Sequence, residues 1–315
     1  MTGRLLISQF ALAGVVLVGA NVFIHRSAAN SVPRRLLRTA DRAEPATDLF
    51  LGNSVMEAGI DTDAFAAAKP GSKSLNLGLG STSPVEHYLL FRRQEKHRGS
   101  VVYYGFFDTE LTDPPSRGWD TLEGNRSMAY YVDPEVALQY YAPDSVVKAF
   151  VFRLCSHVPM AAERYTIWAR VERLRRFFGE FGLPGKDTNR FGRAEDFALL
   201  ESAPEDFAAR CERARAAGLP LSGPITAILE LAKERGSPVV AVEMPMPSGH
   251  RDRNYSRPEW AAYQSYVRNL VREAGGTYLD ASDWVGDDGF ADHLHLNSSG
   301  SRVFSGRLGS WARNH

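Results

Sequence analysis

The sequence has no excess of charge of either sign. Its 315 residues contain 37 Lys and Arg and 37 Asp and Glu, so the formal net charge is 0 at pH 7. Proteins dedicated to nucleic acids normally carry a basic excess, and we therefore expect no nucleic-acid partner. Apolar residues make up 44% of the chain, which excludes a disordered or low-complexity protein.

Cysteine is scarce. Cys155 and Cys211 are the two cysteines of the chain, too few for a disulfide framework or a cysteine-based zinc site. They either form one bridge in an oxidising compartment or remain buried thiols. No phosphate-binding loop signature is present. Asp292 and His295 are the kind of pair that can bind a metal, but we find no further ligands for one in the sequence. We expect neither a metal nor an organic cofactor.

Long apolar runs are also rare, with one exception near the N-terminus. Residues 5–24 contain no charged side chain. A helix of about 20 residues spans about 30 Å, the thickness of the hydrocarbon core of a bilayer. The run predicts a single transmembrane anchor within residues 1–26. A cleaved signal peptide and a buried helix of a soluble core are the alternatives.

The charges around this run leave its orientation open. Several arginines follow it, whereas Arg4 alone precedes it. The positive-inside rule would then keep the rest of the chain in the cytoplasm, although the rule weakens for long translocated domains. The arginines after the run are Arg26, Arg34, Arg35, Arg38 and Arg42.

Short apolar runs that alternate with helical patterns predict the fold. Such alternation indicates a parallel sheet covered by helices on both faces, a three-layer, flavodoxin-like α/β architecture. The predicted strands are 48–52, 74–78, 101–107, 239–243 and 277–280. The predicted helices are 85–96, 226–235, 260–273 and 299–313.

The middle of the chain lacks a convincing strand. We predict a helical insertion, or cap, at about 113–220. Within it, apolar residues between Ile167 and Phe181 form one helical stripe flanked by arginines. This stripe predicts either a helix on a membrane surface or a solvated arginine face. The expected organisation is a linker at 27–46 followed by one domain at 47–315.

Polar residues follow three of the predicted strands. Ser54 comes directly after the first, Gly80 lies in a glycine-rich turn after the second, and Asp108 ends the third. Ligands bind at the carboxyl ends of parallel strands, so these residues are candidates for a site. Each also has a plain structural alternative, namely a helix N-cap for Ser54, a turn for Gly80 and a cap for Asp108.

The segment Asp292-His-Leu-His295 adds a possible base. A spacing of three residues lets Asp292 and His295 face the same way, whereas His293 would point elsewhere. A carboxylate that orients an imidazole makes it a general base. His295 could then take a proton from Ser54, which is the logic of nucleophilic acyl transfer.

In this order along the chain, these segments resemble the SGNH or GDSL hydrolase family. Residues 51–54, Leu-Gly-Asn-Ser, are similar to the first block of the family, with Asn53 in place of the usual Asp. Residues 76–80 resemble the second block, and 292–297 match the Asp-x-x-His block. Residues 105–108 lack the Asn that usually stands in the third block. The resemblance extends over 47–110 and 222–315.

The resemblance implies a function. Ser54 would be the nucleophile, His295 the base and Asp292 its orienter. The N–H groups of Ser54 and Gly80 would form the oxyanion hole, with Ser81 as the alternative to Gly80 because the second block is one residue shorter than usual. Asp108 would contact substrate. Similar membrane-anchored members add or remove acyl groups on exported bacterial polysaccharides, some beside a multispanning membrane acyltransferase. We therefore expect an extracytoplasmic esterase or O-acyltransferase that acts on a glycan ester, with an acetyl group as the expected acyl group.

Two other classes of function stay open. The missing Asn and the large insertion suggest a catalytically inactive scaffold subunit of a polysaccharide acylation or export complex. A flavodoxin-like nucleotide binder is the third class, and the missing phosphate-loop signature argues against it.

Overall fold

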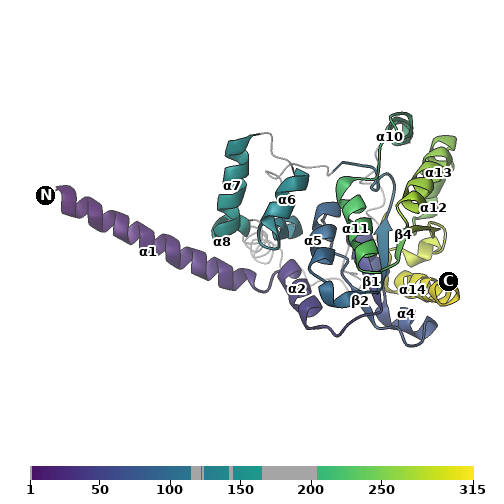
Figure 1. Cartoon of the computed structure of the whole chain (residues 1–315), viewed down its shortest axis with the longest axis horizontal. Helices are drawn as coiled ribbons and strands as arrows, with labels where there is room; N and C mark the ends of the chain where they lie inside the picture. Colours follow the sequence, from purple (N-terminus) through teal and green to yellow (C-terminus); the bar gives the residue numbers. More distant parts are fainter. Residues whose placement is uncertain (1, 115–121, 123, 142–144, 165–203) are drawn as a thin grey trace, which may run out of the picture. The chain divides into compact units, whose positions relative to one another are not determined.

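The computed structural model describes residues 2–114, 122, 124–141, 145–164 and 204–315 (Figure 1). The chain divides into two compact units. The first comprises Met1–Thr39 and Arg117–Gly182, and the second comprises Ala40–Ser116 and Leu183–His315. The predicted helical stripe at 167–181 lies outside the described residues.

A five-stranded, all-parallel sheet forms the centre of the second unit. Its strand order, β2-β1-β3-β4-β5, is that of flavodoxin-like proteins. All five predicted strands are present, and the predicted α/β class is confirmed. The strands are β1 Asp48–Gly52, β2 Ser74–Asn76, β3 Val101–Phe106, β4 Val239–Glu243 and β5 Thr277–Asp280.

Helices cover both faces of this sheet (Figure 1). Alternate strand residues point to opposite faces, so Phe50 and Tyr103 pack against one helical layer and Tyr104 against the other. One layer contains α3 Ser54–Gly59, α4 Thr62–Ala68 and α14 Ser298–Asn314, and the other contains α5 Pro84–Arg92, α11 Gly223–Glu234 and α13 Pro258–Glu273. Helix α10 Pro204–Ala216 packs on α13.

Several shorter helices complete the second unit. They are η1 Glu95–His97, α12 Ser248–His250, η5 Arg251–Tyr255 and η6 Asp287–Gly289. Helices α12 and η5 follow β4, and η6 follows β5. They therefore belong to the connections at the carboxyl ends of the strands, where ligands bind in this class of fold.

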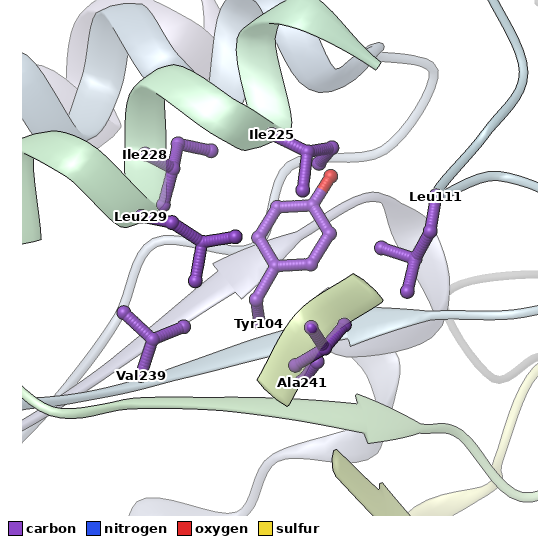
Figure 2. Close-up of a pocket in the computed structure, with 8 residues that line it drawn as sticks. Tyr104, Leu111, Ile225, Ile228, Leu229, Val239 and Ala241 are labelled. Atoms are coloured by element: carbon purple, nitrogen blue, oxygen red, sulfur yellow. The ribbon is translucent and has the colours of Figure 1, made fainter. Parts of the chain in front are cut away.

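A small apolar pocket lies under α11 (Figure 2). The ring of Tyr104 stands between side chains of α11 and the strand residues Val239 and Ala241. The lining has no charged group and none of the predicted site residues. Its residues are Tyr104, Leu111, Ile225, Ile228, Leu229, Val239, Ala241 and Val271. The pocket is therefore a packing space on the face opposite the main aromatic core.

The first unit contains the predicted anchor. Helix α1 Thr2–Ala28 includes a stretch, Ile7–Ala28, that is long and apolar enough to cross a membrane, and it is the one such stretch among the described residues. Phe10 and Phe23 on α1 are more than 70% exposed, which contradicts the alternative of a buried core helix. Other elements are α2 Val32–Arg42, η3 Gly124–Tyr130, α6 Pro134–Tyr141, α7 Val146–His157 and α8 Pro159–Ala162.

Gly300 lets the start of α14 pack closely against the segment that precedes this helix. A Cβ on Gly300, in the first turn of α14, would lie 2.0 Å from the backbone oxygen of Gly289. A Cβ on Gly306, in the same helix, would meet nothing within 4 Å. The first turn of α14 therefore packs directly on the backbone of the loop that precedes it.

This contact predicts opposite effects for two matched substitutions. We expect Gly300→Ala to lower the free energy of unfolding by at least about 2 kcal/mol, because neither backbone can move aside cheaply. Gly306→Ala should raise it by up to about 1 kcal/mol through helix propensity. Denaturant unfolding of the full chain in detergent measures both, and equal effects would contradict the packing described.

Candidate active site

Ser54 begins helix α3 directly after β1. The N-cap is the preceding residue, because the side chain of Asn53 accepts the N–H of Val55 at 3.0 Å. The alternative that Ser54 serves as the cap is therefore wrong. The Oγ atom of Ser54 instead lies 2.8 Å from Nε2 of His295.

Two glycines allow this tight strand-to-helix turn. Gly52 has a φ of +153°, and a Cβ there would lie 2.7 Å from the carbonyl oxygen of Gly105 on β3. A Cβ on Gly105 would lie 2.5 Å from Cε of Met56 on α3. The backbone contact at Gly52 leaves no room for a side chain there, and at Gly105 the space is taken by the end of the Met56 side chain of α3.

Asp292 orients the imidazole of His295. Its Oδ2 lies 2.8 Å from Nδ1 of His295, and its Oδ1 accepts the backbone N–H groups of Leu294 at 2.9 Å and His295 at 2.7 Å. The side chains of Asp292 and His295 are only 6% and 15% exposed. The structure thus brings Ser54, His295 and Asp292 into one hydrogen-bonded line, the arrangement that serine acyl transfer requires.

The local electrostatics keep Asp292 ionised. Burial raises its pKa, but the hydrogen bonds from the ring and backbone of His295 and from Leu294 outweigh burial and leave the pKa below its ordinary value of 3.8. An anionic carboxylate holds a proton on Nδ1 of His295. Nε2 is then the nitrogen that can accept the hydroxyl proton of Ser54.

Gly80 lies beside Ser54, yet its N–H is already engaged. A Cβ on Gly80 would lie 3.3 Å from Cβ of Ser54. The Gly80 N–H donates to Oε2 of Glu57 at 2.8 Å. The sequence reasoning missed Glu57, although it lies three residues after Ser54 on the same helix, a spacing that places the two side chains on one face.

Asp108 lies at the end of β3, as expected, but in a different network. Its Oδ1 accepts the hydroxyl of Tyr255 at 2.9 Å and lies 2.9 Å from Nε2 of His250. No hydrogen bond joins Asp108 to Ser54, His295 or Asp292 within the part of the chain described. His250 and Tyr255 follow β4, and nothing in their spacing marks them as partners of a residue after β3.

A buried acid explains why Asn stands at position 53. The amide of Asn53 donates to Oε1 of Glu110 at 2.6 Å, and the N–H of Phe107 donates to Oε2 at 3.2 Å. Burial raises the pKa of Glu110 to about 8, and these hydrogen bonds do not compensate. An Asp at position 53 would place a second carboxyl group against Glu110, whereas Asn supplies a donor.

Buried His87 fixes the glycine-rich turn. Its Nδ1 lies 2.9 Å from the hydroxyl of Tyr104, and its Nε2 lies 2.9 Å from Oγ1 of Thr82. The hydroxyl of Thr82 donates to the carbonyl of Leu79. A neutral imidazole protonated at Nε2 satisfies all three contacts, with Tyr104 donating to Nδ1. The residues on both sides of Gly80 are thereby tied to β3.

A metal centre finds no support in this region. Among the described residues, no group of three or more His, Cys, Asp or Glu side chains could hold a metal ion. His293 does not enter the hydrogen-bonded line, and its Nδ1 is buried without a recorded partner.

Comparisons with known proteins give little guidance. No protein-family model and no curated protein matches the chain. A crystal structure of a protein from Bacteroides fragilis, described as a candidate acylhydrolase, aligns with 91% of this chain and 96% of its own, at 13% identity and a TM-score of 0.42. Similarity at this level does not establish a relationship, and the function has to be argued from the geometry of the site.

The buried imidazole predicts a specific acid sensitivity. Burial lowers the pKa of His87 to about 3, against an ordinary value of 6.5. Below about pH 6.5, His87 is protonated in the unfolded chain but stays neutral in the folded chain. The free energy of unfolding therefore falls by up to about 1.4 kcal/mol for each pH unit between about pH 6.5 and about pH 3.

Replacing this imidazole should remove that sensitivity. We expect His87→Gln to be less stable than the natural chain at pH 8, because it loses hydrogen bonds, but to lose less stability between pH 6 and pH 4. Denaturant unfolding of both chains across this range measures the difference. A constant difference at every pH would show that His87 does not titrate as described.

Proposed function

We propose that this protein is a serine-dependent acyl-ester hydrolase or O-acyltransferase of the SGNH type. The observation that supports this most strongly is the hydrogen-bonded line of Ser54, His295 and Asp292 at the carboxyl edge of a parallel sheet. Ser54 and His295 are 241 residues apart in the sequence. The backbone N–H groups of Leu294 and His295 orient the carboxylate of Asp292.

The proposed reaction proceeds through an acyl-serine. Nε2 of His295 takes the proton of Ser54 while Oγ bonds to the acyl carbon, and the carbonyl electrons move onto oxygen. The C–O bond to the alcohol then breaks, and His295 returns the proton to the departing oxygen. Water or an acceptor hydroxyl, deprotonated by His295, attacks the acyl-serine and restores Ser54.

Two backbone groups are the proposed oxyanion donors. The N–H of Ser54 lies in the first turn of α3, where N–H groups have no intrahelical acceptor. The N–H of Gly80 is adjacent, but it can stabilise the oxyanion only after the carboxylate of Glu57 withdraws. Asp108, held by His250 and Tyr255, is proposed to contact substrate from the end of β3.

The finer proposal concerns the substrate and its location. We infer an acetyl ester on an exported or cell-surface glycan, an extracytoplasmic domain anchored through residues 5–24, and a multispanning membrane acyltransferase as partner. The resemblance at Ser54, Gly80 and the Asp292–His295 segment supports this, together with an N-terminal helix long enough to cross a membrane.

The alternative is an inactive scaffold of an acylation or export complex. The contact between Glu57 and Gly80 favours it, because a carboxylate occupies one proposed oxyanion donor. The third block also lacks its usual Asn, since Phe107 stands there.

Labelling with a fluorophosphonate distinguishes these two functions. We expect the full chain in detergent to be labelled, and Ser54→Ala and His295→Ala to abolish labelling, because the first lacks the nucleophile and the second its base. Asp292→Asn should slow labelling by about 10⁴-fold through the wrong tautomer.

Replacing the exposed Ser299 by alanine is the matched control and should leave labelling unchanged. If a folded chain with all three residues intact is not labelled, the scaffold function is favoured. Labelling that persists in Ser54→Ala would show that another serine reacts.

Substitution of Glu57 tests the oxyanion donor. We expect Glu57→Ala to increase kcat/KM for an activated acetyl ester by about tenfold or more, because the N–H of Gly80 no longer has a competing anion. Glu57→Gln, which keeps an acceptor oxygen but removes the charge, should give a smaller increase. A decrease in both variants would mean that Glu57 supports the turn at Gly80 rather than blocking it.

A further inference from the structure

The exposed apolar side chains of the molecule are concentrated on two helices. Among the described residues, every large exposed apolar side chain lies on α1 or α7, except Leu219 and Val303. The four on α7 are Val146, Val147, Phe150 and Leu154. Soluble monomers rarely expose such a contiguous apolar surface without a partner.

The apolar residues of α7 form one face. At about 100° per residue, Val146, Phe150, Leu154 and Val147 lie within an arc of about 100°. Val146 is 87% exposed and Phe150 is 64% exposed. Phe152, by contrast, is buried, and its ring centroid lies 4.8 Å from that of Tyr130. The helix therefore packs into its unit through one side and presents the apolar face outward.

A basic side chain borders this face. Arg153 lies about 20° outside Val146, whereas Lys148 lies about 150° from the middle of the apolar arc. Arg153 also pairs with Glu135 of α6 at 2.7 Å. An exposed apolar face edged by a long basic side chain is the pattern of a helix that lies in the headgroup region of a membrane.

The contacts of α8 connect α7 to the anchor within the same unit. Only Val158 separates α7 from α8, and α8 packs against both α7 and α1. The backbone N–H of Met160 on α8 donates to Oδ1 of Asn21 on α1 at 3.1 Å. Asn21 precedes the end of the apolar stretch at Ala28 by about 10 Å of helix. The end of α7 is thus held beside the last two turns of the apolar stretch of α1.

We propose that α7 lies in the surface of the bilayer that α1 spans, with the face of Val146, Val147, Phe150 and Leu154 among the lipid acyl chains. The inference depends on α1 being in a membrane, but not on the acyl-transfer chemistry. The first unit then contacts the membrane in two ways, through a helix that crosses it and a helix that lies on it.

The test places an environment-sensitive fluorophore at single cysteines of the full chain, after Cys155→Ala and Cys211→Ala. The three labelled variants are Phe150→Cys on the apolar face, Lys148→Cys outside that face on the same helix, and Val15→Cys on α1. Each is reconstituted in phosphatidylcholine and phosphatidylglycerol vesicles that carry a quencher at defined depths on the acyl chains.

We expect a blue-shifted emission and strong quenching for the label at position 150, with quenching at 148 several-fold weaker. The label at position 15 should be quenched by the deepest group. Quenching at 15 with a water-like, unquenched label at 150 would overturn the inference while α1 remains an anchor. No quenching at either position would overturn both. Protection at 150 that disappears on dilution of the protein in lipid would identify a second copy as the occupant and would also overturn it.

A second variant keeps the test informative should the label disturb the helix. Phe150→Glu and Leu154→Glu together place two charges on the exposed face without touching the buried Phe152. With the label at Val146→Cys, this pair should abolish the blue shift and quenching, while the label at Val15→Cys is unchanged. Retained quenching at position 146 would contradict insertion of this face.

Discussion

The close approach of backbones at the carboxyl ends of β1 and β3 is the constraint on which the site depends. Gly52 and Gly105 are paired on neighbouring strands where α3 begins, and a Cβ on Gly52 would lie 2.7 Å from the carbonyl oxygen of Gly105. This lets the first turn of α3 lie against the sheet, with Ser54 at its start. A second contact between backbones, at Gly289 and Gly300, brings α14 and its preceding loop to the same edge. At this edge His295 reaches Ser54 across 241 positions in the sequence.

Carboxyl groups at this edge of the sheet have pKa values that are shifted in opposite directions. Burial raises the pKa of Glu110 to about 8 and that of Glu243 to about 7, although each accepts hydrogen bonds. Asp292 is also buried, yet its pKa is lowered, because backbone N–H groups and an imidazole converge on it. The number and geometry of donors, rather than burial alone, therefore decide which acid is an anion at neutral pH. Of these three, Asp292 is the one that pairs with an imidazole, and it is the one whose pKa is lowered.

The sequence predicts the elements of this structure better than their long-range contacts. Continuous apolar runs identify the central strands β1, β3 and β4, which are buried on both faces, while the outer strands β2 and β5 are shorter and less buried. Ser54, Asp292 and His295 can be grouped because each follows a strand or shares a three-residue spacing. The partners of Gly80 and Asp108 could not be found, because Glu57, His250 and Tyr255 reach them through side-chain geometry that no local pattern records.

The division into two units shows the same limit. In the first unit, the described residues up to Thr39 are joined to described residues between 122 and 164 by contacts between segments far apart in the chain. In the sequence Asn21 is a polar interruption of an apolar helix, but in the structure its side-chain oxygen accepts a hydrogen bond from the N–H of Met160. In the sequence Arg34 is one of the charges after the helix that bear on its orientation in a membrane. In the structure its Nε lies 2.7 Å from Oε1 of the buried Glu163. At least one arginine that makes the predicted orientation ambiguous therefore has a structural partner, which weakens its value as a signal of membrane topology.

The hydrogen bond from the Gly80 N–H to Glu57 bears on whether the proposed site can be catalytic. A hydrogen bond from an N–H to a charged acceptor contributes about 1.5–3 kcal/mol. If this bond must break before an oxyanion takes its place, the rate falls by about ten- to a hundredfold, since each 1.4 kcal/mol is a factor of ten. Such a loss is small beside the whole rate enhancement of an acyl-transfer enzyme. The occupied oxyanion donor is therefore compatible with the proposed enzyme, although it is also the contact that favours the inactive scaffold.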